Sequence, residues 1–142
     1  MMAHQQARRL KTREQFQAVL ACAPVARTEH FVMHRMDLDR ADAASGSVSS
    51  ALFARSQLWF GAMVPKRWAR RAVTRNLIKR QIYSLAAQQQ AALPMAAYLV
   101  RLRSGFERHD FRSAASTALR SAVRSEISQL FDKAARPAKV AA

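Results

Sequence analysis

A short cationic run carries the strongest chemical signal in this sequence. Residues 70–80 read RRAVTRNLIKR, a segment rich in Arg and Lys that contains no Asp or Glu. Arg binds phosphate through two parallel hydrogen bonds, and Lys offers a mobile point charge to the same group. The flanking residues Lys66 and Arg67 are also basic. The segment therefore favours binding to a polyanion over the more ordinary interpretation of a solvated helix face.

The spacing within this run predicts an amphipathic helix. At about 100° per residue, Arg71, Arg75 and Lys79 fall on one side. The opposite side carries four apolar residues: Val73, Leu77, Ile78 and Leu85. Like charges at i,i+4 oppose a helix by a few tenths of a kcal/mol each, a repulsion that bound phosphates would relieve.

Asn76 interrupts the cations of the run. Its amide could bond a ribose, a base edge or a metal-bound water, or it could simply be a polar boundary residue. The residue type leaves these alternatives open.

Catalysis by protein side chains finds little support in the sequence. The four His residues have no metal-ligand spacing, Cys22 has no neighbouring His, and the nine carboxylates are scattered. A metal-dependent protein nuclease would need clustered carboxylates. We therefore assign no catalytic residue and no metal ligand.

Length and composition restrict the class of protein. The 142 residues fit one domain, 50% are hydrophobic, and the formal net charge is +15 with a pI near 11.7. Such an imbalance suits RNA, DNA or an anionic membrane as partner. No apolar run approaches the roughly 18 residues of a spanning helix, and the N-terminus lacks a signal-peptide core. A cytoplasmic protein without internal disulfides is expected, since Cys22 is the only cysteine.

Periodicity predicts mixed helices and strands. Thr12 and Gln15 form a capping box for a first helix that ends at Pro24. Gly61 inside the second strand indicates a bulge or a close backbone approach. Asp110 is a plausible N-cap of the last helix. The expected elements are strands at 30–36, 56–64 and 97–103, a long helix at 68–90 and a helix from 110 to 131. Residues 37–56 read as a mobile loop and 134–142 as a disordered tail, leaving one domain at 1–133.

Val64–Ser84 resembles the signature of the bacterial ribonuclease P protein component, in its proteobacterial form. That family has a basic pair at a strand end and then a helix with R-N-x-x-K-R, matched here by Lys66–Arg67 and by Arg75, Asn76, Lys79 and Arg80. Arg70–Ala72 fits an R-R-A element. Arg9, Leu10 and Phe16 fit the family's N-terminal start, so the resemblance covers nearly the whole chain. Where the family helix commonly continues with Arg and Glu, this chain has Tyr83 and Ser84.

The resemblance implies an α/β sandwich of order αβββαβα, with an extra strand near Pro24–Arg27 and a left-handed βαβ crossover. It implies a protein that assists an RNA subunit, which carries Mg²⁺ and cleaves the 5′ leader from precursor tRNA. The residues it implies for RNA-subunit binding are Lys66, Arg67, Arg70, Arg71, Arg75, Asn76, Lys79 and Arg80. A cleft between the first helix and the sheet would hold the leader, with Phe16, Phe31, His34, Phe60, Arg101 and Arg103 as candidate contacts.

Two alternatives stay open at the level of the residues. A structural RNA-binding protein of ribosomal type would share the charge and size. For Phe31 and Phe60, core packing is as reasonable as a cleft position. A DNA-binding module is less consistent, because a strand and Pro65 precede the basic helix instead of another helix. No obligate protein partner is implied.

Overall fold

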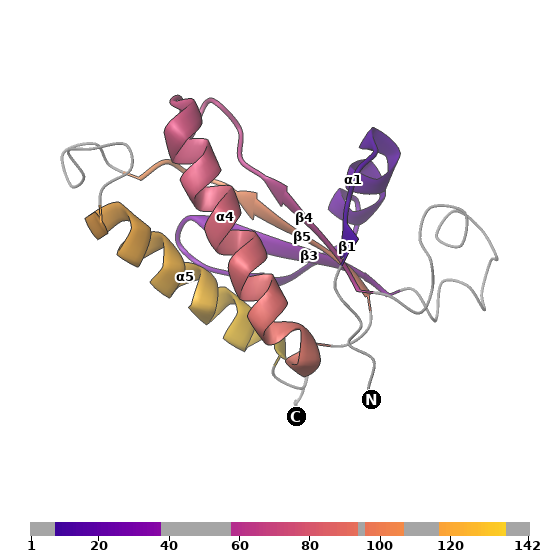
Figure 1. Cartoon of the computed structure of the whole chain (residues 1–142). Helices are drawn as coiled ribbons and strands as arrows, with labels where there is room; N and C mark the ends of the chain where they lie inside the picture. Colours follow the sequence, from indigo (N-terminus) through magenta and orange to yellow (C-terminus); the bar gives the residue numbers. More distant parts are fainter. Residues whose placement is uncertain (1–7, 38–57, 94–95, 107–116, 136–142) are drawn as a thin grey trace.

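The computed structural model describes residues 8–37, 58–93, 96–106 and 117–135. Its elements, with the labels of Figure 1, are β1 (Arg8–Arg9), α1 (Arg13–Leu20), β2 (Pro24–Arg27), β3 (Phe31–Asp37), β4 (Trp59–Met63), α4 (Ala72–Gln89), the 3-10 turn η1 (Gln90–Ala92), β5 (Ala96–Leu102) and α5 (Thr117–Ala135). The expected order αβββαβα is present, preceded by the short strand β1. The extra strand expected at Pro24–Arg27 is β2.

The strands form one mixed sheet in the order β1-β4-β5-β3-β2. The parallel pairs are β1–β4 and β4–β5, and the antiparallel pairs are β3–β5 and β2–β3. Because β4 and β5 are parallel neighbours joined through α4, they form a βαβ unit. Its left-handed sense remains an expectation of the resemblance.

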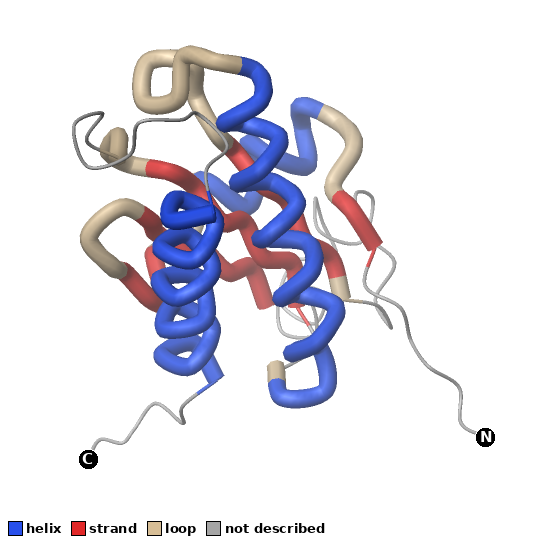
Figure 2. Tube along the Cα trace, turned by 60° about the vertical axis from the view of Figure 1, so that its left-hand side comes forward, coloured by secondary structure: helices blue, strands red, loops and turns tan. Residues whose placement is uncertain are grey.

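The sheet has a different cover on each face. Figures 1 and 2 show α4 and α5 side by side over one face, with α1 on the other side of the strands. The larger core lies under α4 and α5 and includes Phe31, Phe60, Tyr98 and Phe131, each at most 1% exposed. The smaller core under α1 is built on Leu10, Val19, Trp59, Ala97 and Leu99.

Local sequence explains how α1 begins and how it sits. The predicted capping box is confirmed, since the Thr12 hydroxyl accepts the Gln15 N–H and the Gln15 side chain accepts the Thr12 N–H, both at 3.1 Å. The helix ends at Leu20, before Pro24, which instead starts β2. The close approach predicted at Gly61 is also confirmed, because a Cβ there would lie 2.5 Å from Leu10 Cδ1 and 2.9 Å from Phe16 Cε1.

Several predicted boundaries differ from the observed ones. The long helix begins at Ala72 instead of residue 68, because a turn intervenes: the N–H groups of Trp68 and Ala69 both donate to the Pro65 carbonyl. Helix α5 runs to Ala135, and Ala134 is buried, so the tail cannot begin at 134. The predicted loop after Asp37, the Asp110 cap and the rest of the tail lie outside the described residues.

Candidate nucleic-acid interface

The segment between β4 and α4 presents the first four predicted cations to solvent. Lys66, Arg67, Arg70 and Arg71 are all exposed. The turn at Pro65 sets the path of this segment, and Gly105 lies against it: a Cβ on Gly105 would be 2.9 Å from the Trp68 carbonyl oxygen. The segment is therefore fixed from both sides while its cations stay accessible.

The start of α4 is electropositive. Arg71 is its N-cap and makes no side-chain capping bond, and the first turn contains no acidic residue. Unpaired N–H groups and the helix dipole place partial positive charge at a helix N-terminus. In α4 this charge adds to the nearby Arg side chains and favours a phosphate.

The exposed side of α4 carries Asn76, Lys79 and Arg80, while Leu77 and Ile78 are buried against the sheet. The predicted amphipathic helix is thus present, with one correction. Val73, expected on the apolar side, is 47% exposed because it lies in the first turn, beyond the reach of the core.

Arg75 differs from the other cations of the run. It is half-buried, and its Nη1 donates to the carbonyl oxygens of Ala69 at 3.1 Å and Arg70 at 2.8 Å. The expected three-way repulsion of Arg71, Arg75 and Lys79 is therefore reduced, because Arg71 is only the N-cap and Arg75 is held by backbone dipoles. Arg75 fixes the basic segment in addition to carrying charge.

The sequence did not predict a contact that joins β1 to α4. The Arg9 guanidinium carbon lies 3.9 Å from the centroid of the Tyr83 ring, in cation–π geometry. The Tyr83 hydroxyl accepts the Ala62 N–H at 3.2 Å. Burial raises the pKa of Tyr83 above its ordinary value and so further favours the protonated phenol. Only the fold brings Arg9 and Tyr83 together, so no local pattern could have shown it.

The residues predicted to contact the leader are divided between the two faces of the sheet. Phe16, His34 and Arg101 lie on the α1 side, where the half-buried Phe16 packs against the smaller core. Phe31 and Phe60 point to the opposite side and are enclosed under α4 and α5, at 0% and 1% exposure. These two rings are core residues and offer no face to a base, which corrects their inclusion among the leader contacts.

His34 is buried at 5% exposure, so its ring is not an open stacking surface either. Its Nδ1 lies 2.8 Å from the Cys22 carbonyl oxygen, and the Arg101 Nε lies 3.5 Å from its Nε2. These contacts fit the tautomer with the proton on Nδ1. His34 therefore orients Arg101 on the α1 face.

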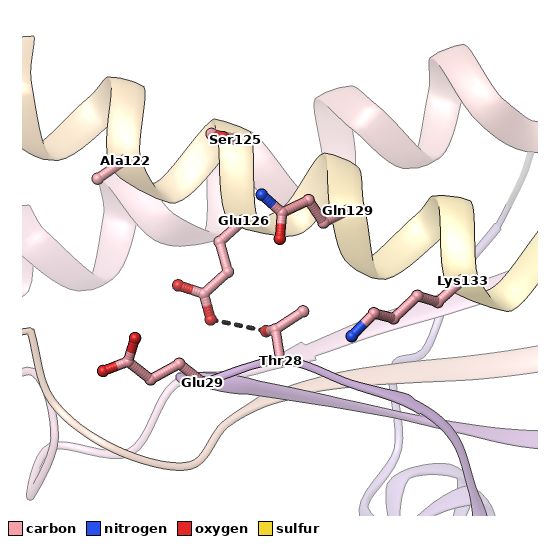
Figure 3. Close-up of a pocket in the computed structure, with 7 residues that line it drawn as sticks. All are labelled: Thr28, Glu29, Ala122, Ser125, Glu126, Gln129 and Lys133. Carbon is pink, nitrogen blue, oxygen red and sulfur yellow. Dashed lines mark hydrogen bonds between the residues drawn. The ribbon is translucent and has the colours of Figure 1, made fainter.

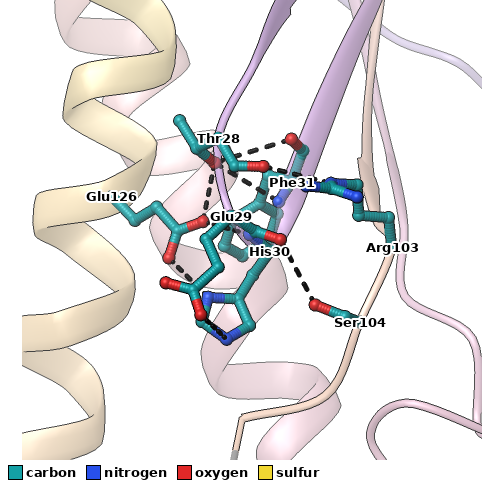
Figure 4. Close-up of polar contacts among 7 residues, drawn as sticks. All are labelled: Thr28, Glu29, His30, Phe31, Arg103, Ser104 and Glu126. Atoms are coloured by element: carbon teal, nitrogen blue, oxygen red, sulfur yellow. Dashed lines mark hydrogen bonds and ion pairs between the residues drawn. The ribbon is translucent and has the colours of Figure 1, made fainter.

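Arg103 is exposed beyond the end of β5, and its Nε donates to the Thr28 carbonyl at 3.1 Å. It belongs to a polar network around the β2–β3 turn (Figure 4). In this network the Glu126 carboxylate accepts hydrogen bonds from the Thr28 hydroxyl, at 2.6 Å, and from the His30 backbone N–H, and its other oxygen lies 2.8 Å from His30 Nδ1. The network joins α5 to the turn.

Next to this network lies an open pocket of about 360 Å³. Figure 3 shows Glu126 and Lys133 of α5 facing Thr28 and Glu29 across it. Lys133 Nζ donates to the Arg27 carbonyl at 2.9 Å. Glu126 and Lys133 of this pocket both hold the turn through hydrogen bonds.

Within the described residues, no three His, Cys, Asp or Glu side chains gather closely enough to hold a metal ion. The pKa of the half-buried Cys22 thiol is raised by burial and by Asp37, which disfavours the thiolate. No helix among these residues is long and apolar enough to cross a membrane.

Known proteins resemble this chain in sequence and in fold. The family model described as Ribonuclease P matches residues 4–134. The ribonuclease P protein component of Ralstonia pickettii (strain 12J) is 36% identical over 135 residues, covering 95% of this chain and 84% of the relative. That of Burkholderia mallei (strain SAVP1) is 35% identical over 130 residues, covering 92% and 83%. A solved Staphylococcus aureus RNase P protein superposes with a TM-score of 0.61 at 17% identity, over 89% of this chain and 94% of that one.

Proposed function

Because this chain belongs to the ribonuclease P protein family and is a protein subunit of that tRNA-processing endoribonuclease, we propose that it binds the RNA subunit through α4 and holds the 5′ leader of precursor tRNA against α1. Removal of the leader generates the mature 5′ end. In this division of labour the protein positions RNA, and the RNA subunit performs the cleavage.

The charge distribution around α4 carries this proposal. Between Asp42 and Glu107 the sequence contains no Asp or Glu, so nothing there neutralises the cations. Lys79 and Arg80 are exposed on the helix, and Lys66 and Arg67 extend the same surface into the preceding segment. Cationic side chains on a rigid helix gain affinity for RNA by releasing counterions from phosphates. Asn76, exposed among them, can bond sugar or base edges.

The face covered by α1 supports a role in holding a single strand. The half-buried Phe16 ring rests over Gly61, and Met36 and Met63 pack against the same small core. Arg101 lies on the same face, and Arg103 follows two residues later. Base stacking on an aromatic ring contributes about 1–3 kcal/mol per base, and Arg neutralises the backbone. Phe16, Arg101 and Arg103 are the proposed leader contacts.

The described side chains offer no cluster of oxygen ligands for Mg²⁺. We assign the metal mainly to the RNA subunit, whose phosphate oxygens are the hard ligands that Mg²⁺ prefers, and where it would stabilise charge at the scissile phosphate. The proposed place of action is the cytoplasm, together with precursor tRNA.

A structural RNA-binding protein of ribosomal type would show a similar charge. The family match over residues 4–134 favours the ribonuclease P role over it. A major-groove DNA reader is disfavoured because β4 and a turn precede α4, where a helix-turn-helix motif has another helix.

The α4 assignment is tested by charge removal. Lys79→Gln and Arg80→Gln are each expected to weaken binding of the RNA subunit and to lower the slope of log K against log salt by about one. Arg120→Gln, which removes an exposed charge from α5, is the matched control. Binding measured across a salt series gives the answer, and slopes equal to that of the control would remove α4 from the interface.

The leader assignment is tested with two substrates. Phe16→Ala is expected to weaken holoenzyme binding to precursor tRNA by roughly tenfold, the equivalent of about 1–2 kcal/mol of stacking. Mature tRNA, which has no leader, should bind unchanged. Gln17→Ala on the exposed side of α1 serves as control. An equal loss for both substrates would contradict the cleft assignment.

A further inference from the structure

A groove of about 300 Å³ runs between the edge strand β1 and the C-terminal half of α4. Its lining has Arg residues on one side and a helix surface with two small residues on the other: Arg8, Arg9, Phe60, Tyr83, Ala86, Ala87 and Gln90. No acidic side chain lines it.

Strand pairing directs Arg9 toward this groove. Arg9 is the register partner of Phe60 in the parallel β1–β4 pair, and paired residues of adjacent strands point to the same face. Since Phe60 faces α4 and α5, Arg9 does too. The backbone N–H groups of Arg8 and Leu10 bond Leu58 and Phe60 at 2.7 and 2.8 Å, which holds the strand in place.

Tyr83 fixes the far end of the Arg9 side chain. Its ring lies under the guanidinium at 3.9 Å, and its hydroxyl is itself tied to the Ala62 N–H. A cation–π contact uses the flat face of the guanidinium and leaves the N–H groups at its edge able to donate. Arg9 is exposed, so those donors can reach a phosphate.

The groove continues the basic surface of α4. Tyr83 follows Lys79 by four residues and Arg80 by three, so all three share one side of the helix. Ala87 follows Tyr83 by four residues and extends this side, and its small side chain lets a chain approach the helix closely.

We propose that this groove binds a phosphodiester segment of the RNA subunit, with Arg9 as the phosphate contact and Tyr83 as the residue that positions Arg9. The inference rests on the proposed function of α4 and extends that interface to the edge of the sheet. The RNA subunit is the partner because the groove is continuous with α4, whereas the proposed leader cleft lies on the opposite face.

The experiment measures RNA-subunit binding by the full chain across a salt series. Arg9→Gln is expected to weaken binding and lower the salt slope by about one, as Lys79→Gln does. Arg27→Gln, an exposed Arg on the opposite edge strand β2, is the control and should keep the wild-type slope.

The positioning role of Tyr83 is separated from its structural role by two substitutions. Tyr83→Phe keeps the ring and loses the acceptor for Ala62, so it should lower the melting temperature and keep the salt slope. Tyr83→Leu should also lower the salt slope. In the Tyr83→Leu background, Arg9→Gln should then weaken RNA-subunit binding less than it does in the wild type. Equal slopes in Tyr83→Leu and the wild type would overturn the positioning role.

These measurements distinguish failure of the groove proposal from failure of the proposed α4 interface. If Lys79→Gln weakens binding and Arg9→Gln matches Arg27→Gln, the groove is wrong while the α4 interface stands. If Arg9→Gln changes affinity only for precursor tRNA, the groove serves the leader and the inference is overturned. If neither Lys79→Gln nor Arg9→Gln changes binding, the proposed function of α4 fails first.

Discussion

Glu126 shows how much one side chain can organise in this protein. Its carboxylate takes hydrogen bonds from Thr28 and His30, and the side chain is only 14% exposed. From the other direction, Arg103 and Ser104 donate to the carbonyls of Thr28 and Glu29. The β2–β3 turn is thus held between α5 and the end of β5, which in turn fixes where Arg103 lies.

Glu126→Gln replaces an acceptor-only carboxylate with an amide that has one acceptor and one donor group. We expect a loss of roughly 1–3 kcal/mol in the free energy of unfolding, because buried N–H and O–H donors lose a charged acceptor. Urea denaturation followed by circular dichroism measures it. Asp132→Asn, an exposed carboxylate on the same helix, should change stability little, and a similar change in both variants would argue against the network.

The residues of the basic motif could be identified from the sequence, but the different contacts that each of them makes could not. Arg75 looks like its neighbours in a helical projection, yet it bonds the Ala69 and Arg70 carbonyls. The family helix commonly has Arg where this chain has Tyr83. In the fold, the guanidinium group of Arg9 lies over the Tyr83 ring. Both facts depend on where a loop and a distant strand lie, which helical periodicity does not encode.

At the scale of elements, the close fit of α1 against the sheet depends on Gly61. Gly61→Ala should lower stability by about 1–3 kcal/mol, since the new methyl group would clash with Leu10 and Phe16. The displaced Phe16 should also weaken binding to precursor tRNA relative to mature tRNA. Denaturation midpoints and the two affinities are the measurements.

Leu10→Ala tests whether the clash with Leu10 causes the loss of stability in Gly61→Ala. It removes the atoms nearest to the added methyl group, so Gly61→Ala should cost less in the Leu10→Ala background than in the wild type. Strictly additive losses would show that the clash does not involve Leu10.

The elements themselves were largely predictable, whereas the faces of the strands were not. Alternation predicted β3, and β4 and β5 were also expected as strands, but both faces of this sheet are apolar, so the sequence pattern could not tell which face each ring occupies. Phe31 and Phe60 therefore remained ambiguous until α4 and α5 were seen to cover them. Strand β1 has two residues and carries no periodic signal of its own.

At the scale of the whole molecule, the sheet separates two proposed RNA sites. In this proposal the RNA-subunit surface is on the side of α4, and the leader contacts are on the side of α1. The core between them contains packed aromatic rings, since Phe60 stacks on Tyr98 at 5.1 Å and meets Phe131 edge-on at 5.9 Å. Such a core can hold the two sites in a fixed relation.

Tyr98 makes this core sensitive to alkaline pH. Burial raises the pKa of Tyr98 to about 12, while Tyr in the unfolded chain ionises near 10. The folded state therefore keeps its proton longer, and the associated stability, present below pH ~10, is lost as the pH rises toward ~12. The loss should reach about 2–3 kcal/mol.

Unfolding by urea between pH 9 and pH 12, with absorbance at 295 nm to follow phenolate, checks this dependence. Tyr98→Phe should show a flatter decline than the wild type, and Tyr83→Phe keeps the Tyr98 response. Identical pH profiles for Tyr98→Phe and the wild type would mean that Tyr98 does not couple to folding.

The central claim is that this protein positions RNA for cleavage by an RNA subunit. The most direct test is reconstitution with a bacterial ribonuclease P RNA at low magnesium, following cleavage of precursor tRNA. We predict cleavage at the mature 5′ end only when both parts are present, with reduced rates for Lys79→Gln and Arg80→Gln. Tight binding of the protein without stimulation of cleavage would contradict the account and favour a purely structural RNA-binding role.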